Sequence, residues 1–407
     1  MPLELRLAWR NVWRNPRRTG LTVAATVFAV VLVVFFVAMA AGLHEKMIED
    51  SVRLHSGHLT LSGPGYFANR TLAQHVRLDA PLRGLLEETP GVRGWAPRVI
   101  GFGLLSRETD AQGVALMGVD PEREPSVSSL ADRLTRGSFV SRERPHGIVL
   151  GERLARNLGA RIGDELFLYS QAYSLETAAD LYRVIGVMKL PDVTLDRSLA
   201  LVSLADAQEF FVYGDRVSEV AVLAEDADAA PGLAAALQRR DPAVEIHIWS
   251  ELMPELVQFI FIDDAGMYIL LVILVVVVAF GILNTILMSV LERTRELGVL
   301  LALGLRPRAV FRLVYLESLL LAGAGLALGL AVGIPLVLWF QGHPILLGER
   351  MAEAYELFGM EPLMTWKLKP LNPIGSAITI LGVAAAAALY PALKASRGRP
   401  VDALRSL

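Results

Sequence analysis

The chain has 407 residues, of which 53% are apolar, and its mean hydropathy is +0.45. Its formal net charge of −3 implies no general attraction to nucleic acid, and its lack of cysteine excludes disulfides, thiolate catalysis and cysteine-ligated metals. A helix needs about 20 consecutive apolar residues to cross a bilayer, and four segments meet that test.

Residues 1–18, which precede the first of these spans, are predicted to form an amphipathic helix at the cytoplasmic membrane interface. One face carries Leu5, Trp9, Val12 and Trp13, and another carries Arg6, Arg10 and Arg14. A simple positive anchor for the first span is a compatible alternative. The uncharged run over 21–42 is longer than the roughly 7–15-residue core of a signal peptide. We therefore expect a retained span over 19–43.

Residues 44–265 are predicted to form a large extracytoplasmic domain. GHLTLSG, LYRVIGVMK and SLALVSL alternate or cluster apolar residues as strands do, and AQEFFVYG and 229–240 are typical of short helices. Gly159 and Gly163 stand at turn positions. This mixture indicates an α+β domain, with an inserted strand-rich lobe at about 120–210.

Three more spans follow, at 266–291, 309–340 and 373–393. A cytoplasmic elbow over 292–308 joins the first two, a short periplasmic loop over 341–372 joins the last two, and 394–407 is a cytoplasmic tail. Basic residues gather before the first span, in the elbow and in the tail, which puts both termini in the cytoplasm. The predicted fold class is a polytopic α-helical membrane protein with four transmembrane helices and an α+β domain between the first two.

No catalytic signature is present. There is no P-loop, no HExxH and no Gly-x-Ser-x-Gly, so we do not expect this chain to be an enzyme. His55 and His58 have no third ligand nearby, so we expect no metal site. Glu317 is interpreted as an interfacial glutamate paired with a basic neighbour. The small-residue pairs Gly325/Gly329 and Gly329/Gly333 suit close helix packing.

The elbow ERTRELGVLLALG is the main indication of function. It can form a short helix with Glu292, Arg295 and Glu296 on one side and Leu297, Leu300 and Leu301 on the other. Gly304 is expected to end this helix and Pro307 to begin the next. The charged side is then available to a soluble partner. A solvated connecting loop is the alternative.

The run SVLERTRELGVLLALGLRPRAVFRLVYLESLLLAGAGLALGLAVG and the ending RGRPVDALRSL closely resemble the MacB/FtsX/LolC–LolE superfamily of ABC-transporter permeases. SGHLTLSGPGYF and GIVLGERLARNLGARIGDELFLYS look most like the LolC/LolE lipoprotein-releasing branch. The resemblance implies a porter-plus-sabre-like domain and a coupling helix that docks on a separate ATPase, which binds ATP and Mg²⁺. It assigns coupling to Glu292, Arg293, Thr294, Arg295, Glu296, Gly298, Leu301 and Gly304.

The resemblance also implies a bacterial inner-membrane complex of two permeases, as a homo- or heterodimer, with two ATPases. Lipoprotein acyl chains would contact residues near the outer ends of the first two spans: Phe35, Phe36, Met39, Met267 and Ile269. A periplasmic carrier would meet a hook-like loop made of Ser170, Gln171, Ala172, Tyr173, Ser174 and Leu175. This segment is short and lacks proline, and recruitment of a carrier stays open.

Two other functions remain open at this point. A permease of the MacB or FtsX kind would transmit ATP-driven motion to an efflux partner or a cell-wall hydrolase, and nothing would pass through its spans. A membrane-tethered sensor or scaffold would need no ATPase, and reversing the charges of Glu292 and Glu296 would then change nothing.

Overall fold

The computed structural model describes residues 3–14, 16–54, 56–108, 110–348, 352, 355 and 362–397. The chain divides into two compact units. The helical unit comprises Met1–His44, Phe259–Leu346 and Leu363–Leu407, and the mixed unit comprises Glu45–Gln258 and Leu347–Pro362. Each unit is therefore assembled from segments that lie far apart in the sequence.

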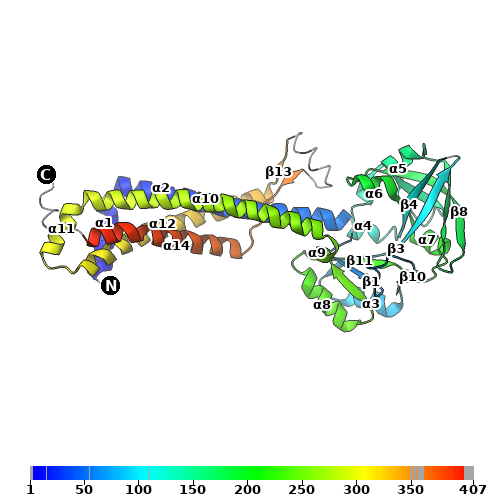
Figure 1. Cartoon of the computed structure of the whole chain (residues 1–407), viewed down its shortest axis with the longest axis horizontal. Helices are drawn as coiled ribbons and strands as arrows, with labels where there is room; N and C mark the ends of the chain where they lie inside the picture. The colour runs from blue at the N-terminus through cyan, green and yellow to red at the C-terminus, as the bar shows by residue number, and fades with distance from the viewer. Residues whose placement is uncertain are drawn as a thin grey trace. The chain divides into compact units, whose positions relative to one another are not determined.

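The helical unit contains the long apolar helices. Its described helices are α1 (Leu3–Arg14), most of α2 (Pro16–Leu54), most of α10 (Pro254–Glu292), α11 (Thr294–Ala302), α12 (Pro307–Gly342) and α14 (Leu371–Ser396). Among the described residues, α2, α10, α12 and α14 are long and apolar enough to cross a membrane, in agreement with the four expected spans. They run alongside one another in Figure 1, with α1 and α11 at the same end of the bundle.

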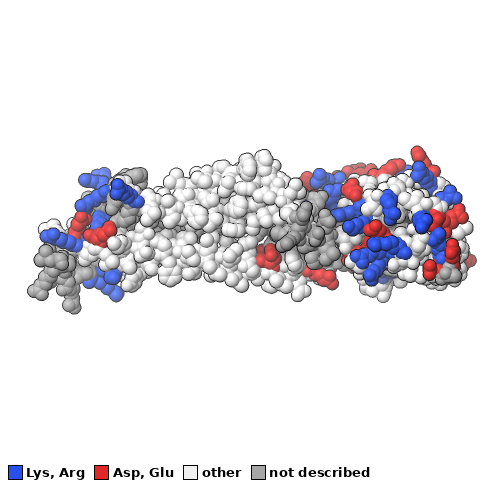
Figure 2. All heavy atoms as spheres, turned by 90° about the horizontal axis from the view of Figure 1, so that it is seen from above, with Lys and Arg blue, Asp and Glu red and all other residues white. Residues whose placement is uncertain are grey.

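Charge on the helical unit gathers at the end that carries α1 and α11. Figure 2 shows Lys and Arg there, while the middle of the bundle is free of charged side chains on the face in view. The exposed basic residues of this end are Arg6, Arg10, Arg14, Arg17, Arg295, Arg306, Arg308, Arg312, Lys394 and Arg397. An apolar belt beside a basic end is the pattern expected where one end of a bundle faces the cytoplasm.

Glycines on α12 allow α2 to approach closely. A Cβ added at Gly325 would lie 2.5 Å from Cβ of Thr26, and one added at Gly329 would lie 2.6 Å from Cβ of Val30. The expected close packing is thus confirmed at these two positions, where no larger side chain fits. Helix α10 differs, because only 11% of its most apolar stretch is buried, against 39% for α12.

The mixed unit is built around one ten-stranded sheet with the order β12-β1-β11-β3-β4-β9-β6-β8-β5, while β7 pairs with β3 and β8. Its strands are β1 (Leu59–Ser62), β3 (Val92–Arg107), β4 (Asp110–Val119), β5 (Leu134–Gly137), β6 (Gly147–Gly151), β7 (Glu165–Gln171), β8 (Thr177–Met188), β9 (Leu199–Ser203), β11 (Glu219–Ala224) and β12 (Glu245–Ile248). Two short pairs stand apart, β2 (Val76–Arg77) with β10 (Arg216–Val217) and, in the helical unit, β13 (Ile345–Leu346) with β14 (Leu363–Met364).

The long strand β3 organises this sheet. It pairs antiparallel with β11 at its start, with β4 along most of its length, and with β7 near its end. The strands of 120–210, expected as an inserted lobe, join the same sheet through β4 and β7. Some of their buried side chains belong to the core cluster that extends from Leu59 to Val244, and others form a second cluster with Leu54 and Val119. Most pairings are antiparallel, and β4–β9 and β6–β8 are parallel.

Short helices cover this sheet. They are α3 (Ala80–Glu88), α4 (Glu124–Val127), the 3₁₀ turn η1 (Ala131–Arg133), α5 (Glu152–Asn157), α6 (Val193–Ser198), α7 (Leu204–Phe210), α8 (Ala230–Arg240) and α9 (Trp249–Leu252). Side-chain oxygens cap three of them: Asp79 accepts from Leu82 N, Asp192 from Leu195 N, and Ser203 from Asp206 N. These caps satisfy backbone donors that helix starts leave open, so the sequence itself sets where the helices begin.

Candidate functional site

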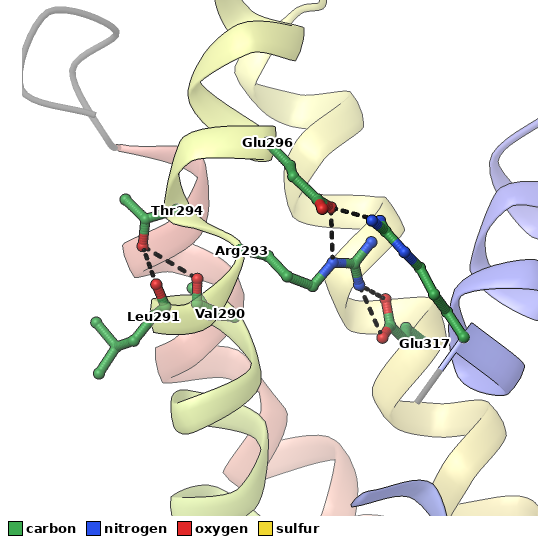
Figure 3. Close-up of polar contacts among 7 residues, drawn as sticks. Val290, Leu291, Arg293, Thr294, Glu296 and Glu317 are labelled. Atoms are coloured by element: carbon green, nitrogen blue, oxygen red, sulfur yellow. Dashed lines mark hydrogen bonds and ion pairs between the residues drawn. The ribbon is translucent and has the colours of Figure 1, made fainter. Parts of the chain in front are cut away.

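The elbow between α10 and α12 folds as the short helix α11. Helix α10 ends at Glu292, and Arg293 leaves the helical conformation before Thr294 begins the new helix. The Thr294 hydroxyl donates to the backbone oxygens of Val290 and Leu291, which are 3.1 and 2.8 Å away (Figure 3). The side chain thereby satisfies carbonyls that the end of α10 leaves open.

Helix α11 ends at a left-handed glycine, as the sequence predicts. Gly304 has φ +93, and its N–H donates to the oxygen of Leu301 while that of Leu305 donates to the oxygen of Leu300. This pair of bonds is the Schellman motif, which favours glycine because a side chain strains that conformation. Pro307 then begins α12. The short helix therefore has a defined length and direction.

One side of α11 is buried and the other is open. Leu297 and Gly298 are buried, and Leu300 and Leu301 pack partly against α10 and α12. The open side carries Thr294 and Arg295 together with two apolar side chains that sequence reasoning missed, Val299 and Leu303. Leu303 is 79% exposed. An apolar side chain left bare beside a cation is typical of a protein-binding surface; we call Arg295, Val299 and Leu303 the open face.

One of the charges expected to face a partner, Arg293, is turned inward instead. Arg293 Nη1 donates to both oxygens of Glu317 on α12, at 3.1 and 3.0 Å, and the two side chains are only 17% and 8% exposed (Figure 3). Glu317 is thus paired with a basic residue, as the sequence predicts, and this residue belongs to the elbow. Within a membrane helix such pairing lowers the cost of burying a carboxylate.

Glu296 connects this pair to α1. Its Oε2 accepts from Arg14 Nη1 at 2.8 Å and from Arg293 Nε at 3.3 Å. The hydrogen bond from Arg14, and then that from Arg293, holds the pKa of Glu296 below its ordinary value, while slight burial opposes them. Four alternating charges therefore run from α1 through α11 to α12; we call Arg14, Glu296, Arg293 and Glu317 the charge chain.

A small polar cavity lies beside the charge chain, between α2, α10 and α12. Its polar lining is Thr22, Thr285, Ser289, Arg293, Glu317 and Ser318, and its volume is about 20 Å³. This is enough for one water molecule. Glu317 and Arg293 thus line the same small cavity as four hydroxyl side chains.

The residues expected to meet acyl chains differ in exposure: some pack within the bundle, and one is open at its surface. The ring of Phe35 lies 5.3 Å from those of Phe340 and Trp366, and Met39 packs in the same cluster. Phe36, which lies 6.1 Å from Phe35, and Met267 are half-buried, whereas Ile269 is exposed. Ile269 and the neighbouring apolar side chains of α10 therefore offer the open surface.

A polar contact that sequence reasoning missed joins α2 to α10 at the other end of the bundle. His44 Nε2 lies 2.7 Å from Asp263 Oδ2, and His44 Nδ1 lies 3.5 Å from Asp264 Oδ1. The buried side chains of α10 are confined to its last third, at Ile282, Ile286 and Val290. This histidine therefore fastens a stretch of α10 that has little packing of its own.

The hook-like segment is a tight turn between β7 and β8. Tyr173 N donates to the oxygen of Phe211, and the Arg216 guanidinium lies 4.8 Å from the Tyr173 ring centre. Leu175, at φ +68, is 76% exposed. A groove of about 770 Å³ adjoins the turn, with Phe102, Leu104, Tyr169 and Leu175 in its lining. The turn is thus held at its base, with an apolar tip.

Metal ligands do not converge among the described residues. His58 accepts from Ala224 N at 3.2 Å, and burial lowers its pKa. His55 lies outside the described residues, as do the side chains of Leu5, Trp9 and Trp13.

Comparison with known proteins identifies both units. A profile described as "MacB-like periplasmic core domain" matches residues 19–240, which is more than half of the chain, and one described as "FtsX-like permease C-terminal" matches 268–400. The chain is 25% identical over 342 residues to the lipoprotein-releasing system transmembrane protein LolC of Neisseria meningitidis serogroup B, covering 80% of this chain and 82% of the relative.

It is also 26% identical over 334 residues to the lipoprotein-releasing system transmembrane protein LolE of Haemophilus influenzae, covering 79% of each. Among solved structures, the periplasmic region of MacB from Actinobacillus actinomycetemcomitans matches 49% of this chain and 92% of its own length, with 15% identity and a TM-score of 0.36.

Proposed function

Since this chain belongs to the MacB/FtsX superfamily of ABC-transporter permeases, in its LolC/LolE branch, we propose that it extracts lipoproteins or similar lipidated cargo from the inner membrane. A separate ATPase subunit would hydrolyse the ATP. The chain is a multi-pass inner-membrane protein with a periplasmic domain. Its termini would lie in the cytoplasm, as the basic end of the bundle supports (Figure 2).

The open face of α11 is the observation that carries this proposal. A short helix with a defined start and end, held between two membrane helices, presents Arg295, Val299 and Leu303 outward. A soluble ATPase can bind there by covering the apolar side chains, while Arg295 pairs with an acidic residue of the ATPase. ATP and Mg²⁺ would bind to that ATPase.

The exposed apolar surface of α10 supports the part of the proposal that concerns cargo binding. Ile269 and its neighbours expose apolar side chains that a lipid anchor or a second permease copy, identical or related, can cover. On the mixed unit, the turn 170–175 and its apolar groove offer a periplasmic carrier a surface. The relatives LolC and LolE are lipoprotein-releasing system transmembrane proteins.

One observation favours a second function, the transmission of motion to a periplasmic partner. Helices α2 and α10 each run for 39 residues, which is about 58 Å at 1.5 Å per residue and well beyond the roughly 30 Å core of a bilayer. Uninterrupted helices of this length can carry movement out of the membrane. In this case no lipid-linked cargo would be released.

Reconstitution of the permease with its ATPase in proteoliposomes distinguishes lipoprotein extraction from transmission of motion. The vesicles would contain a fluorescent triacylated lipoprotein, and release would be followed with ATP and with a non-hydrolysable analogue. Release that needs hydrolysis supports extraction. ATP hydrolysis without release supports transmission of motion. Failure of any ATPase to bind the permease would leave the sensor or scaffold hypothesis.

A further inference from the structure

The attachment of α11 to α12 depends on few side chains. Within α11 only Leu297 and Gly298 are buried, and the connection to α10 passes through the non-helical Arg293. Arg293 nevertheless reaches α12, where it binds Glu317. A partner that pushes α11 could rotate it about the Arg293 backbone unless this ion pair holds it to α12.

Helix α12 in turn is tightly fitted to α2. The contacts at Gly325 with Thr26 and at Gly329 with Val30 leave no space for independent rotation of the two helices. The two positions lie two and three turns beyond Glu317 along α12. Any displacement of α12 at Glu317 therefore reaches α2 through closely packed backbone.

We propose that Arg293 and Glu317 are positioning residues that make α11 and α12 move as one body during the ATPase cycle. Glu296 and Arg14 extend this connection to α1. The inference rests on the proposed function, because it requires an ATPase on the open face. It assigns to Arg293, the most buried charge of the elbow, a role different from docking, namely the transfer of the displacement to the membrane helices.

A distance measurement tests this independently of the cargo. The chain has no cysteine, so Ala302→Cys on α11 and Leu328→Cys on α12, both exposed, can carry the only two spin labels in the permease. The permease–ATPase complex would be measured in lipid nanodiscs without nucleotide and with a non-hydrolysable ATP analogue. We expect one unchanged distance in both states. With Arg293→Gln added, we expect the distance to shift or broaden when the nucleotide binds.

Charge exchange separates positioning from simple folding. Arg293→Glu and Glu317→Arg alone should each raise the ATP hydrolysed per lipoprotein released by about tenfold, equivalent to about 1.4 kcal/mol, while affinity for the ATPase stays within about threefold. The double exchange should restore the ratio. Arg308→Glu, an exposed charge reversal at the same end of the bundle, is the matched control.

The outcomes are distinguishable. An unchanged distance in Arg293→Gln, or single reversals that release cargo at the parent ratio, would overturn the inference. Equal losses of complex yield, ATPase affinity and release would also overturn it, because they indicate a purely structural pair. An unmodified complex that hydrolyses ATP but releases no lipoprotein overturns the proposed cargo, and the distance measurement then decides the inference alone.

Discussion

Each unit of the protein contains an arginine–glutamate pair, and the two pairs are built differently. In the mixed unit, Arg98 on β3 uses two nitrogens on Glu124 of α4, Nε to Oε2 at 3.2 Å and Nη2 to Oε1 at 2.6 Å, and both side chains are fully buried. In the helical unit, Arg293 offers Glu317 only Nη1 and turns Nε to Glu296.

The difference shows how the same two residue types can fix one helix on a sheet or link two helices to each other. A guanidinium that uses two nitrogens is held in the plane of its carboxylate, so Arg98 fixes the position of α4 on the sheet. Arg293 divides its nitrogens between Glu317 of α12 and Glu296 of α11, so its guanidinium links these two helices. The first arrangement suits a fixed position on a sheet, and the second suits two helices that move together.

Removal of Arg98 should have the largest effect on stability. Arg98→Leu leaves Glu124 buried without its cation. The substitution also removes the positive charge beside Glu219, whose nearest oxygen lies 3.7 Å from Arg98. Breaking a buried pair from one side typically costs about 3–5 kcal/mol. Denaturant unfolding of the full chain, followed by protease cleavage within the mixed unit, measures the loss.

The matched control removes both charges. Arg98→Leu combined with Glu124→Leu should recover the part of the loss that Glu124 causes, because apolar side chains of similar volume replace a buried pair at little cost, while Glu219 still lacks its cation. If the single variant unfolds at the same denaturant concentration as the parent, Arg98 does not hold α4 on the sheet, and the contrast between the two pairs is lost.

Glu317→Gln should have a smaller effect, because the amide oxygen can still accept from Arg293, which also keeps its bond to Glu296. We expect a loss of about 1.5–3 kcal/mol, the range for a hydrogen bond to a charged group, measured by thermal unfolding in detergent. Ser318→Ala is the control, since its hydroxyl bonds only within its own helix, to Val314 O at 2.8 Å. A loss as large as that of Arg98→Leu would mean that the two pairs contribute equally to stability, and the contrast between them would be lost.

The sequence predicts the ends of α11 but not its contacts. Gly304 and Pro307 act through local backbone geometry, so their roles can be read from neighbouring residues. The basic residue Arg293, which binds Glu317, lies 24 residues away across a turn, so its proximity depends on how α10, α11 and α12 fold together. The apolar character of Leu297 correctly predicted that it is buried. The same reasoning could not predict that Leu303 is exposed, since an exposed apolar residue has no distinct sequence pattern.

Long-range packing explains the other gaps. Phe35 was expected to face cargo, but Trp366, which follows the third span, returns to pack on its ring. Such contacts depend on how distant segments fold together, and a single sequence has no signal for them. The four spans were predicted because a run of apolar residues is itself the signal.

The two charge networks should also respond to pH with opposite sign. Burial raises the pKa of Glu219, although Arg98 opposes the shift. Because the folded-state pKa lies above the unfolded value of about 4.5, this group stabilises the fold below that value, and its contribution is lost as pH rises through the folded pKa. The difference in unfolding free energy between the parent and Glu219→Gln should therefore change in the parent's favour on acidification. A pH-independent difference would contradict the assignment.

Arg14→Gln should have the smallest effect on stability. Its bond to Glu296 is mostly exposed, and exposed pairs contribute about 0–1 kcal/mol, less at high salt. Because Arg14 lowers the pKa of Glu296, the contribution is present above about pH 4.5 and is lost as pH falls through the folded-state pKa. Thermal unfolding of parent and variant at low and high salt measures the difference, which should vanish at high salt. If it persists there, the bond between α1 and α11 is shielded from solvent, and α1 is a fixed part of the elbow like Arg98 in its sheet.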